Sequence, residues 1–332
     1  MADLRTTITE VVTALGMLGY DDLDAALTAR PDAIVNVGGE IHEALQRARK
    51  EGRHTDVFAA AFINGQRFLS ARDALRGRVP FLVEWKGAHR APGDEVVPAD
   101  LRVDHVYLVS CKYLSRIVVN ASPQYLFERL LAGGQGRRGA DWFAEVAPAE
   151  HAALYAAVRG AIDPALPTDV RALDRVQRRA LGTALRDGWP DGALDHYHAL
   201  TTAVATESAA RWAAAMRTEP EAMLWRLLRI GSAPYFVLGA SPKGFLRLRI
   251  ATPWDWRRRY ELRRFVVEAG EGRGQPVVAW SAVVRRRDDR SETTVCGHVE
   301  VRWSHGRFAG PPEAKVYLDT PHDEVPGYFP LA

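Results

Sequence analysis

An aspartate and a lysine stand at the ends of two neighbouring apolar runs. Pro98-Ala99-Asp100 begins the first run and Ser110-Cys111-Lys112 ends the second, with a turn expected at Asp104-His105. A carboxylate binds a hard divalent cation through oxygen, and the cation polarises a phosphodiester and acidifies a bound water. A lysine on the same strand face can stabilise the charge that develops on phosphorus. The residues therefore predict metal-dependent phosphodiester hydrolysis, with Asp100, Ser110 and Lys112 at the site.

Residues 98–112 in this setting resemble the PD-(D/E)XK nuclease superfamily, which includes many restriction endonucleases. The resemblance covers roughly residues 38–135, and in it Asp100 matches the metal-binding aspartate and Lys112 the lysine. It implies a mixed sheet flanked by helices, with one helix before the strands and another directly after them. It also implies a Mg²⁺- or Mn²⁺-dependent DNA endonuclease of restriction or phage-defence type, acting as a homodimer.

The second metal-binding carboxylate is missing from the motif. Ser110 stands where the family usually has Glu or Asp. Glu84 on a neighbouring strand is the first candidate to replace it, and Asp104 is another. Glu40 and Glu43 on the preceding helix are further candidates. The sequence leaves open which carboxylate completes the set.

The turn between the two runs decides whether the motif can assemble. Side chains alternate along a strand, so a two-residue turn would place Asp100 and Lys112 on opposite faces. The motif needs a wider or bulged turn, or Asp104 in place of Asp100. Three other interpretations stay open: an ordinary buried strand whose lysine extends to solvent, a non-catalytic protein of the same fold that binds nucleic acid or a protein partner, and an enzyme unrelated to nucleic acid.

A second carboxylate pattern lies near the end of the chain. His298 and Glu300 are followed, after a Gly/Pro turn, by Glu313-Ala314-Lys315. His298 and Glu300 would share a strand face and could bind a metal. No helix is expected next to this pattern, so a salt-bridged β-hairpin is the competing interpretation.

Arginine clusters are the candidate contacts to DNA. The net charge is only +3, so clustering matters more than the total. Residues 252–260 interleave aromatic residues with arginine, a composition that can stack on bases and hold phosphates. An alternative is that arginine is simply the preferred cation of this chain, which repeats it at 263–264 and 285–287. The candidate nucleic-acid contacts are Arg116, Trp256, Arg257, Arg258 and Arg259.

The expected fold is α+β, with a mixed, helix-flanked sheet in a nuclease-like core at 1–135. A helical region follows at 136–230, and a β-rich domain at 231–332 is the candidate for DNA recognition. Apolar periodicity predicts helices at 4–15, 21–29 and 39–50 and a strand at 79–85, whereas 56–76 reads as a helix or as a hairpin turning at Asn64-Gly65. Ser122-Pro123 is typical of a helix start.

Several protein classes are not indicated. The first residues do not read as a signal peptide, and no apolar run reaches the roughly 18 residues of a membrane span. Two cysteines suggest neither a disulfide framework nor a zinc site. We therefore expect a cytoplasmic protein. The Gly-x-Gly-x-x-Gly pattern at 134–139 follows a helix instead of a strand, which argues against a dinucleotide site.

Overall fold

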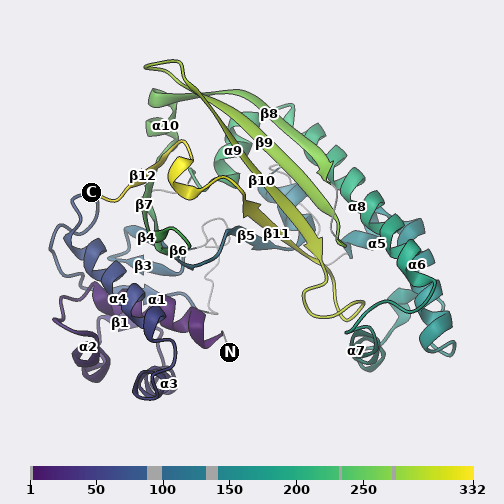
Figure 1. The fold of residues 1–332 in the computed structure, drawn as a ribbon, viewed down its shortest axis with the longest axis horizontal. Helices are drawn as coiled ribbons and strands as arrows, with labels where there is room; N and C mark the ends of the chain where they lie inside the picture. Colours follow the sequence, from purple (N-terminus) through teal and green to yellow (C-terminus); the bar gives the residue numbers. More distant parts are fainter. Residues whose placement is uncertain (1–2, 88–98, 132–140, 232–233, 271–273) are drawn as a thin grey trace. The chain divides into compact units, whose positions relative to one another are not determined.

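The computed structural model describes residues 3–87, 99–131, 141–231, 234–270 and 274–332 (Figure 1). Contacts between residues divide the chain into two units. Unit 1 comprises Met1–Ser115, Arg229–Arg259 and Pro321–Ala332, and unit 2 comprises Arg116–Leu228 and Tyr260–Thr320. Each unit is built from segments that are distant in the sequence, so the chain passes from one unit to the other several times.

Unit 1 contains a seven-stranded mixed sheet in the order β1-β2-β3-β4-β6-β7-β12. Its strands are β1 Ile34–Val35, β2 Val83–Trp85, β3 Leu101–Val103, β4 Tyr107–Tyr113, β6 Tyr235–Ser241, β7 Gly244–Ile250 and β12 Tyr328–Pro330. Strands β2, β3 and β4 form an antiparallel meander, and β6 lies parallel to β4. Parallel neighbours need a long crossover, and here the crossover contains a large part of unit 2.

The helices of unit 1 are α1 Leu4–Gly16, α2 Leu23–Ala29, α3 Gly39–Lys50, α4 Thr55–Ser70 and α10 Pro253–Arg259, with a 3₁₀ turn at His322–Glu324. Two of them, α1 and α4, pack on one face of this sheet. Helices α1 and α4 contact each other closely because neither Gly16 nor Gly65 has a side chain. A Cβ at Gly65 would lie 2.2 Å from the carbonyl oxygen of Thr13.

The core of unit 1 fills the space between these two helices and the sheet. The ring of Phe68 on α4 meets that of Phe236 on β6 edge to face, with centroids 5.0 Å apart. Alternate residues of β4, Val109 and Cys111, belong to the same buried cluster. Since side chains alternate, Ser110 and Lys112 face away from α1 and α4.

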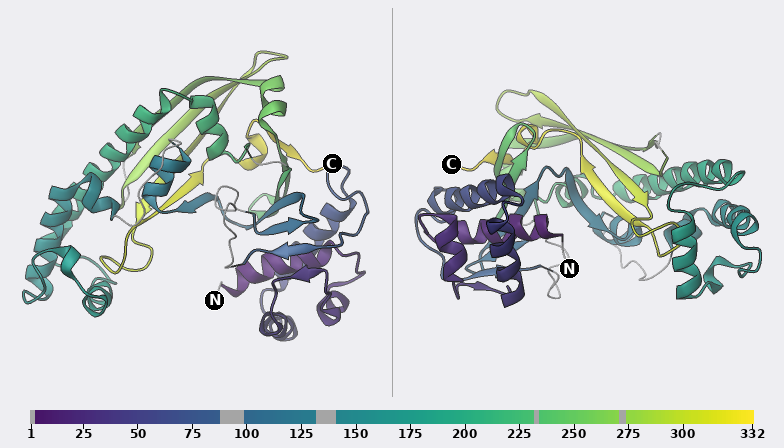
Figure 2. Two further views of the ribbon diagram at one scale, coloured as in Figure 1. Left: turned by 180° about the vertical axis from the view of Figure 1, so that it is seen from behind. Right: turned by 60° about the horizontal axis from the view of Figure 1, so that its bottom comes forward.

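Unit 2 contains a five-stranded antiparallel sheet in the order β5-β11-β10-β9-β8. Its strands are β5 Ile117–Ala121, β8 Tyr260–Gly270, β9 Val277–Arg286, β10 Glu292–Arg302 and β11 Glu313–Leu318. The long helix α8, Ala193–Met216, packs on β8 and β9, and the left view in Figure 2 shows it running beside the sheet. The ring of Trp212 on α8 meets Phe265 on β8 edge to face at 6.3 Å.

The remaining helices of unit 2 come from the middle of the chain. They are α5 Trp142–Val146, α6 Pro148–Ile162, α7 Arg175–Ala184, α8 Ala193–Met216 and α9 Pro220–Leu227, with a π-helix at Tyr125–Leu130 and a 3₁₀ turn at Val170–Ala172. None of the helices in the described ranges is long and apolar enough to cross a membrane.

The expected α+β class, with helices and a mixed sheet, is confirmed. So are the three N-terminal helices and the helical middle of the chain. Residues 55–70 form a helix, because Gly65 serves a close helix crossing and not a turn. The expectation that a helix follows directly after β4 is wrong: β5 comes first and pairs with β11 of the other sheet. Helix α10 was not expected.

Candidate functional site

The turn between β3 and β4 brings the motif residues onto one face of the sheet. Val103 pairs with Tyr107, so the loop between the strands has three residues. Asp104 and His105 both adopt positive φ values, 50° and 59°, which lets the loop close. With this register Asp100 lies across from Ser110, and Lys112 lies one pleat further along the same face. The wide turn that the motif requires is therefore present.

Asp100 is held by the end of β4. One of its oxygens, Oδ2, accepts hydrogen bonds from the backbone N–H of Cys111 at 2.6 Å and from the hydroxyl of Ser110 at 3.1 Å. Its backbone N–H donates to the carbonyl of Val109, and its carbonyl accepts from the N–H of Lys86. Ser110 thus satisfies part of the hydrogen-bonding capacity of the Asp100 carboxylate. It does so at the position where the nuclease family has a second carboxylate.

Lys112 ends this row of polar side chains. It is partly exposed and lies opposite Gly239 of β6. No ion pair joins its ammonium group to a carboxylate in the described ranges. A Cβ at Gly239 would lie 1.8 Å from the carbonyl oxygen of Lys112, so glycine allows the two strands to pair at this point. The lysine retains a positive charge that can bind an external anion.

Glu84 belongs to an ion pair on the adjacent strand pair. It lies across from Arg102, whose guanidinium makes two hydrogen bonds to the carboxylate at 2.5 and 2.7 Å. His105 adds a contact of 3.3 Å. The hydrogen bond from Arg102 lowers the pKa of Glu84. With both oxygens engaged by arginine, Glu84 is occupied by a structural interaction.

Asp104 stabilises the loop that precedes β2. Its Oδ1 accepts from the backbone N–H groups of Phe81 and Leu82, and Oδ2 accepts from Arg78 at 2.5 Å. Glu43, a further candidate metal ligand, is exposed on α3, a helix that packs against α2. Asp104 therefore holds the turn, and neither residue has a described contact to Asp100.

The described residues do not form a complete set of ligands for a divalent cation. Among the residues that the structure describes, no group of three His, Cys, Asp or Glu side chains could hold a metal ion. Asp100 is the one carboxylate of the row, and its neighbour across the strand pair is a hydroxyl. Pro98 and the pattern at 134–139 lie outside the described residues.

Three buried polar residues of unit 1 extend the row and were not singled out from the sequence. Tyr235 starts β6, and its phenol interacts with Ser110; burial raises its pKa to about 12. Burial also raises the pKa of Tyr328, which interacts with Tyr235 and with Arg229. Both phenols therefore stay protonated at neutral pH. A buried polar group needs partners, so Tyr235 helps to fix the position of Ser110.

Cys111 faces the core, as the alternation predicts. Burial is the largest cause that raises the pKa of its thiol well above the usual value. A thiol with a raised pKa is a poor nucleophile. The geometry agrees with the sequence interpretation that Cys111 takes no part in chemistry.

The candidate DNA contacts differ in their exposure. Trp256 is fully buried, and its indole N–H donates to the carbonyl of Pro326, so this ring cannot stack on a base. Trp254 is 70% exposed instead. The arginines that follow, Arg257, Arg258 and Arg259, are exposed at the end of α10, and Arg259 lies over the ring of Phe329. Arg116 is exposed in unit 2.

Two other arginine clusters, 263–264 and 285–287, are partly neutralised within unit 2. Glu261 pairs with Arg263, Arg285 and Arg287. Arg286 pairs with Asp288. These clusters carry less free positive charge than their sequence suggests.

The second carboxylate pattern is part of a charged β-sheet surface. Glu300 lies opposite Lys315 and pairs with Arg302 at 3.3 Å, and His298 contacts Asp319 at 2.8 Å. These side chains alternate with buried valines along β10. The salt-bridged hairpin is therefore the interpretation that the structure favours.

Comparison of the chain with models of known families, with curated proteins and with solved structures gives no match.

Proposed function

We propose that this chain binds nucleic acid and that Lys112 contacts a backbone phosphate at the strand face of unit 1. One observation carries the proposal: the carboxylate of Asp100 is bonded to Ser110 and Cys111, whereas Lys112 on the same face has no described carboxylate partner. Lysine is a common phosphate ligand that acts as a point charge. The face therefore offers a positioned cation where the resemblance places a phosphodiester.

A second feature of unit 1 supports binding to an extended polyanion. The end of α10 exposes three consecutive arginines beside the exposed ring of Trp254. Cations at a helix C-terminus also stabilise the helix, which explains part of this cluster. Exposed arginine next to an exposed aromatic ring still provides phosphate and base contacts of the kind that single-strand binders use.

Binding of fluorescein-labelled DNA, measured by anisotropy, tests the proposal. Lys112→Ala should weaken binding by a similar factor for unrelated DNA sequences, because a phosphate contact carries no sequence information. Lys50→Ala is the matched control, since it removes the same charge from the exposed end of α3 in unit 1. Equal affinities for wild type and Lys112→Ala would refute the assignment of this site.

A metal-dependent DNA endonuclease is the second candidate function. It is favoured by the shared face of Asp100 and Lys112, which the three-residue turn creates. Cleavage of supercoiled plasmid with Mg²⁺ or Mn²⁺, by wild type and by Lys112→Ala, separates the two functions. Activity lost in the variant supports the nuclease. Equal cleavage by both proteins excludes this site, and DNA binding without cleavage supports the non-catalytic protein.

A further inference from the structure

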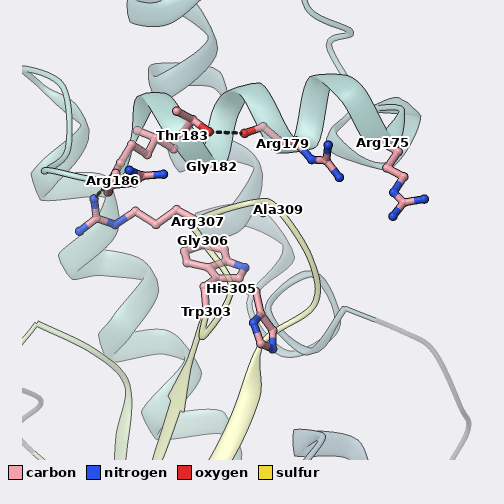
Figure 3. Close-up of a pocket in the computed structure, with 11 residues that line it drawn as sticks. Arg175, Arg179, Gly182, Thr183, Arg186, Trp303, His305, Gly306, Arg307 and Ala309 are labelled. Atoms are coloured by element: carbon pink, nitrogen blue, oxygen red, sulfur yellow. Dashed lines mark hydrogen bonds between the residues drawn. The ribbon is translucent and has the colours of Figure 1, made fainter. Parts of the chain in front are cut away.

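One face of α7 in unit 2 carries exposed arginines. Arg175 and Arg179 are four residues apart and so lie on the same side of the helix, and Arg186 follows two turns later just beyond its end. In Figure 3 the side chains of Arg175 and Arg179 point to the side of α7 on which the loop after β10 lies. Like charges at this spacing repel each other and destabilise a helix. A helix surface of this kind is well suited to an anionic ligand.

The loop after β10 closes against this face and leaves a cavity. Gly182 permits the approach, because a Cβ there would lie 2.9 Å from Cβ of Ala309. The cavity measures about 660 Å³ and is lined by the α7 arginines and by Trp303, His305 and Arg307 of the loop (Figure 3). Small-molecule sites commonly have volumes of about 300–1,000 Å³. The space is therefore sufficient for a nucleotide.

Arg307 fixes one end of the cavity. Its guanidinium donates to the carbonyl of Leu185 and, at 2.7 Å, to that of Gly188, both beyond the last residues of α7. It also lies over the ring of Trp189, 4.5 Å from the centroid. These contacts use no carboxylate, so Arg307 adds positive charge to a rigid wall.

Two carboxylates close to the cavity, those of Asp174 and Glu313, interact with groups other than the arginines of α7. Asp174 caps the N-terminus of α7 by accepting from two backbone N–H groups, and Glu313 accepts from His305 at 3.1 Å. No ion pair joins Arg175, Arg179 or Arg186 to a carboxylate in the part of the chain that the structure describes. The cavity therefore has a net positive lining.

An aromatic ring completes the lining. Trp303 packs edge to face on Phe143, with centroids 4.6 Å apart, and also contacts Phe308. Its indole Nε1 is buried and has no acceptor among the described residues. The ring itself is only partly buried, so it can stack on a base, as aromatic residues do in single-strand binding sites.

We propose that this cavity binds a nucleoside phosphate, with the phosphate on the arginines of α7 and the base against Trp303. Arginine forks match the geometry of phosphate oxygens, and the ring provides the apolar contact. The same chemistry is presented by a free nucleotide and by the phosphorylated end of a nucleic-acid strand. The site is formed by unit 2 alone and does not rest on the strand site of unit 1.

Calorimetric titration of the full chain with three probes tests the proposal: adenosine 5′-monophosphate, a 5′-phosphorylated oligothymidylate and inorganic phosphate. Arg179→Ala should weaken nucleotide or oligonucleotide binding at least about tenfold, since it removes a charge-assisted hydrogen bond. Arg217 is an exposed arginine at the end of α8 in the same unit. The Arg217→Ala variant removes the same charge and should keep wild-type affinity.

The probes also distinguish the two sources of the ligand. Tight binding of the mononucleotide indicates that the ligand is a free nucleotide. Binding of the oligonucleotide alone, weakened by Arg179→Ala, indicates that the ligand is a strand end. Inorganic phosphate bound as tightly as either would overturn the nucleoside assignment. Equal losses in Arg179→Ala and Arg217→Ala, or no binding of any probe by wild type, would overturn the site itself.

Discussion

The hydroxyl of Ser110 donates a hydrogen bond to Oδ2 of Asp100 across the β3–β4 pair, at 3.1 Å. The backbone N–H of Cys111 donates to the same oxygen. A hydroxyl at this position neutralises no charge, but it satisfies a carboxylate that would otherwise need a cation. The two hydrogen bonds explain how Asp100 is tolerated next to the core with no arginine partner among the described residues.

Replacing Ser110 by aspartate should make the stability of the protein depend on a bound metal ion. Two carboxylates side by side repel each other, so Ser110→Asp should lower the melting temperature at neutral pH. Mn²⁺ should raise it again, because two carboxylates bind a hard cation better than one. Thermal unfolding with Mn²⁺ and with EDTA measures both effects. Ser110→Asn, which has the same shape without the charge, should not respond to Mn²⁺; an equal response in the two variants would contradict the account.

The ion pair between Glu84 and Arg102 should give the stability of unit 1 a defined pH dependence. Glu84→Gln should cost about 1–2 kcal/mol at pH 7, since the pair is part-exposed. The Arg102 hydrogen bond lowers the folded-state pKa of Glu84 below the ordinary glutamate value of 4.5. The contribution is thus fully present above pH 4.5 and is lost as the pH falls through the folded-state pKa.

Urea unfolding at several pH values checks this sign. The difference in free energy of unfolding between wild type and Glu84→Gln should shrink below pH 4.5. A difference that stays constant from pH 7 to pH 3 would show that the carboxylate charge contributes nothing.

The sequence predicted local elements well and long-range pairing poorly. Helix α3 was predictable because its apolar spacing and its cationic end are local signals. Residues 117–121 gave no comparable signal, because β5 is fixed by pairing with β11 almost two hundred positions later. Asn64-Gly65 has turn-like composition, and the contact between Gly65 and α1 decides for a helix.

The candidate site was predictable in its residue types and not in its assembly. Asp100 and Lys112 were recognisable from spacing, but their common face depends on the left-handed conformations of Asp104 and His105. Glu84 was the first choice for a metal ligand because its cross-strand partner, Arg102, could not be known without the register. The arginine cavity of unit 2 could not be predicted from the sequence, because its two walls come from separate segments of the chain.

The two cysteines should differ sharply in reactivity. Cys111 is buried with a raised thiol pKa, and Cys296 is exposed. Ellman's reagent should therefore titrate one thiol per native chain and two in urea. Cys296→Ser is the control: it should abolish the native reaction, and a native reaction that persists would place Cys111 on the wrong face of β4.

The crossing of α1 and α4 should not tolerate a methyl group. Gly65→Ala would put Cβ 2.2 Å from the carbonyl of Thr13, so a loss of about 1–3 kcal/mol is expected from overpacking. Gly160→Ala on α6 meets open space and should be neutral or stabilising by up to about 1 kcal/mol. Thermal unfolding of both variants measures the contrast; a Gly65→Ala protein as stable as wild type would refute the close crossing.

The salt dependence of duplex DNA binding tests most directly whether Lys112 holds a phosphate. Each phosphate contact contributes about 0.9 to the slope of log K against log salt concentration. The account predicts that Lys112→Ala lowers the magnitude of this slope by about 0.9, and that Lys50→Ala leaves it unchanged. A slope for Lys112→Ala equal to that of wild type would contradict the central claim.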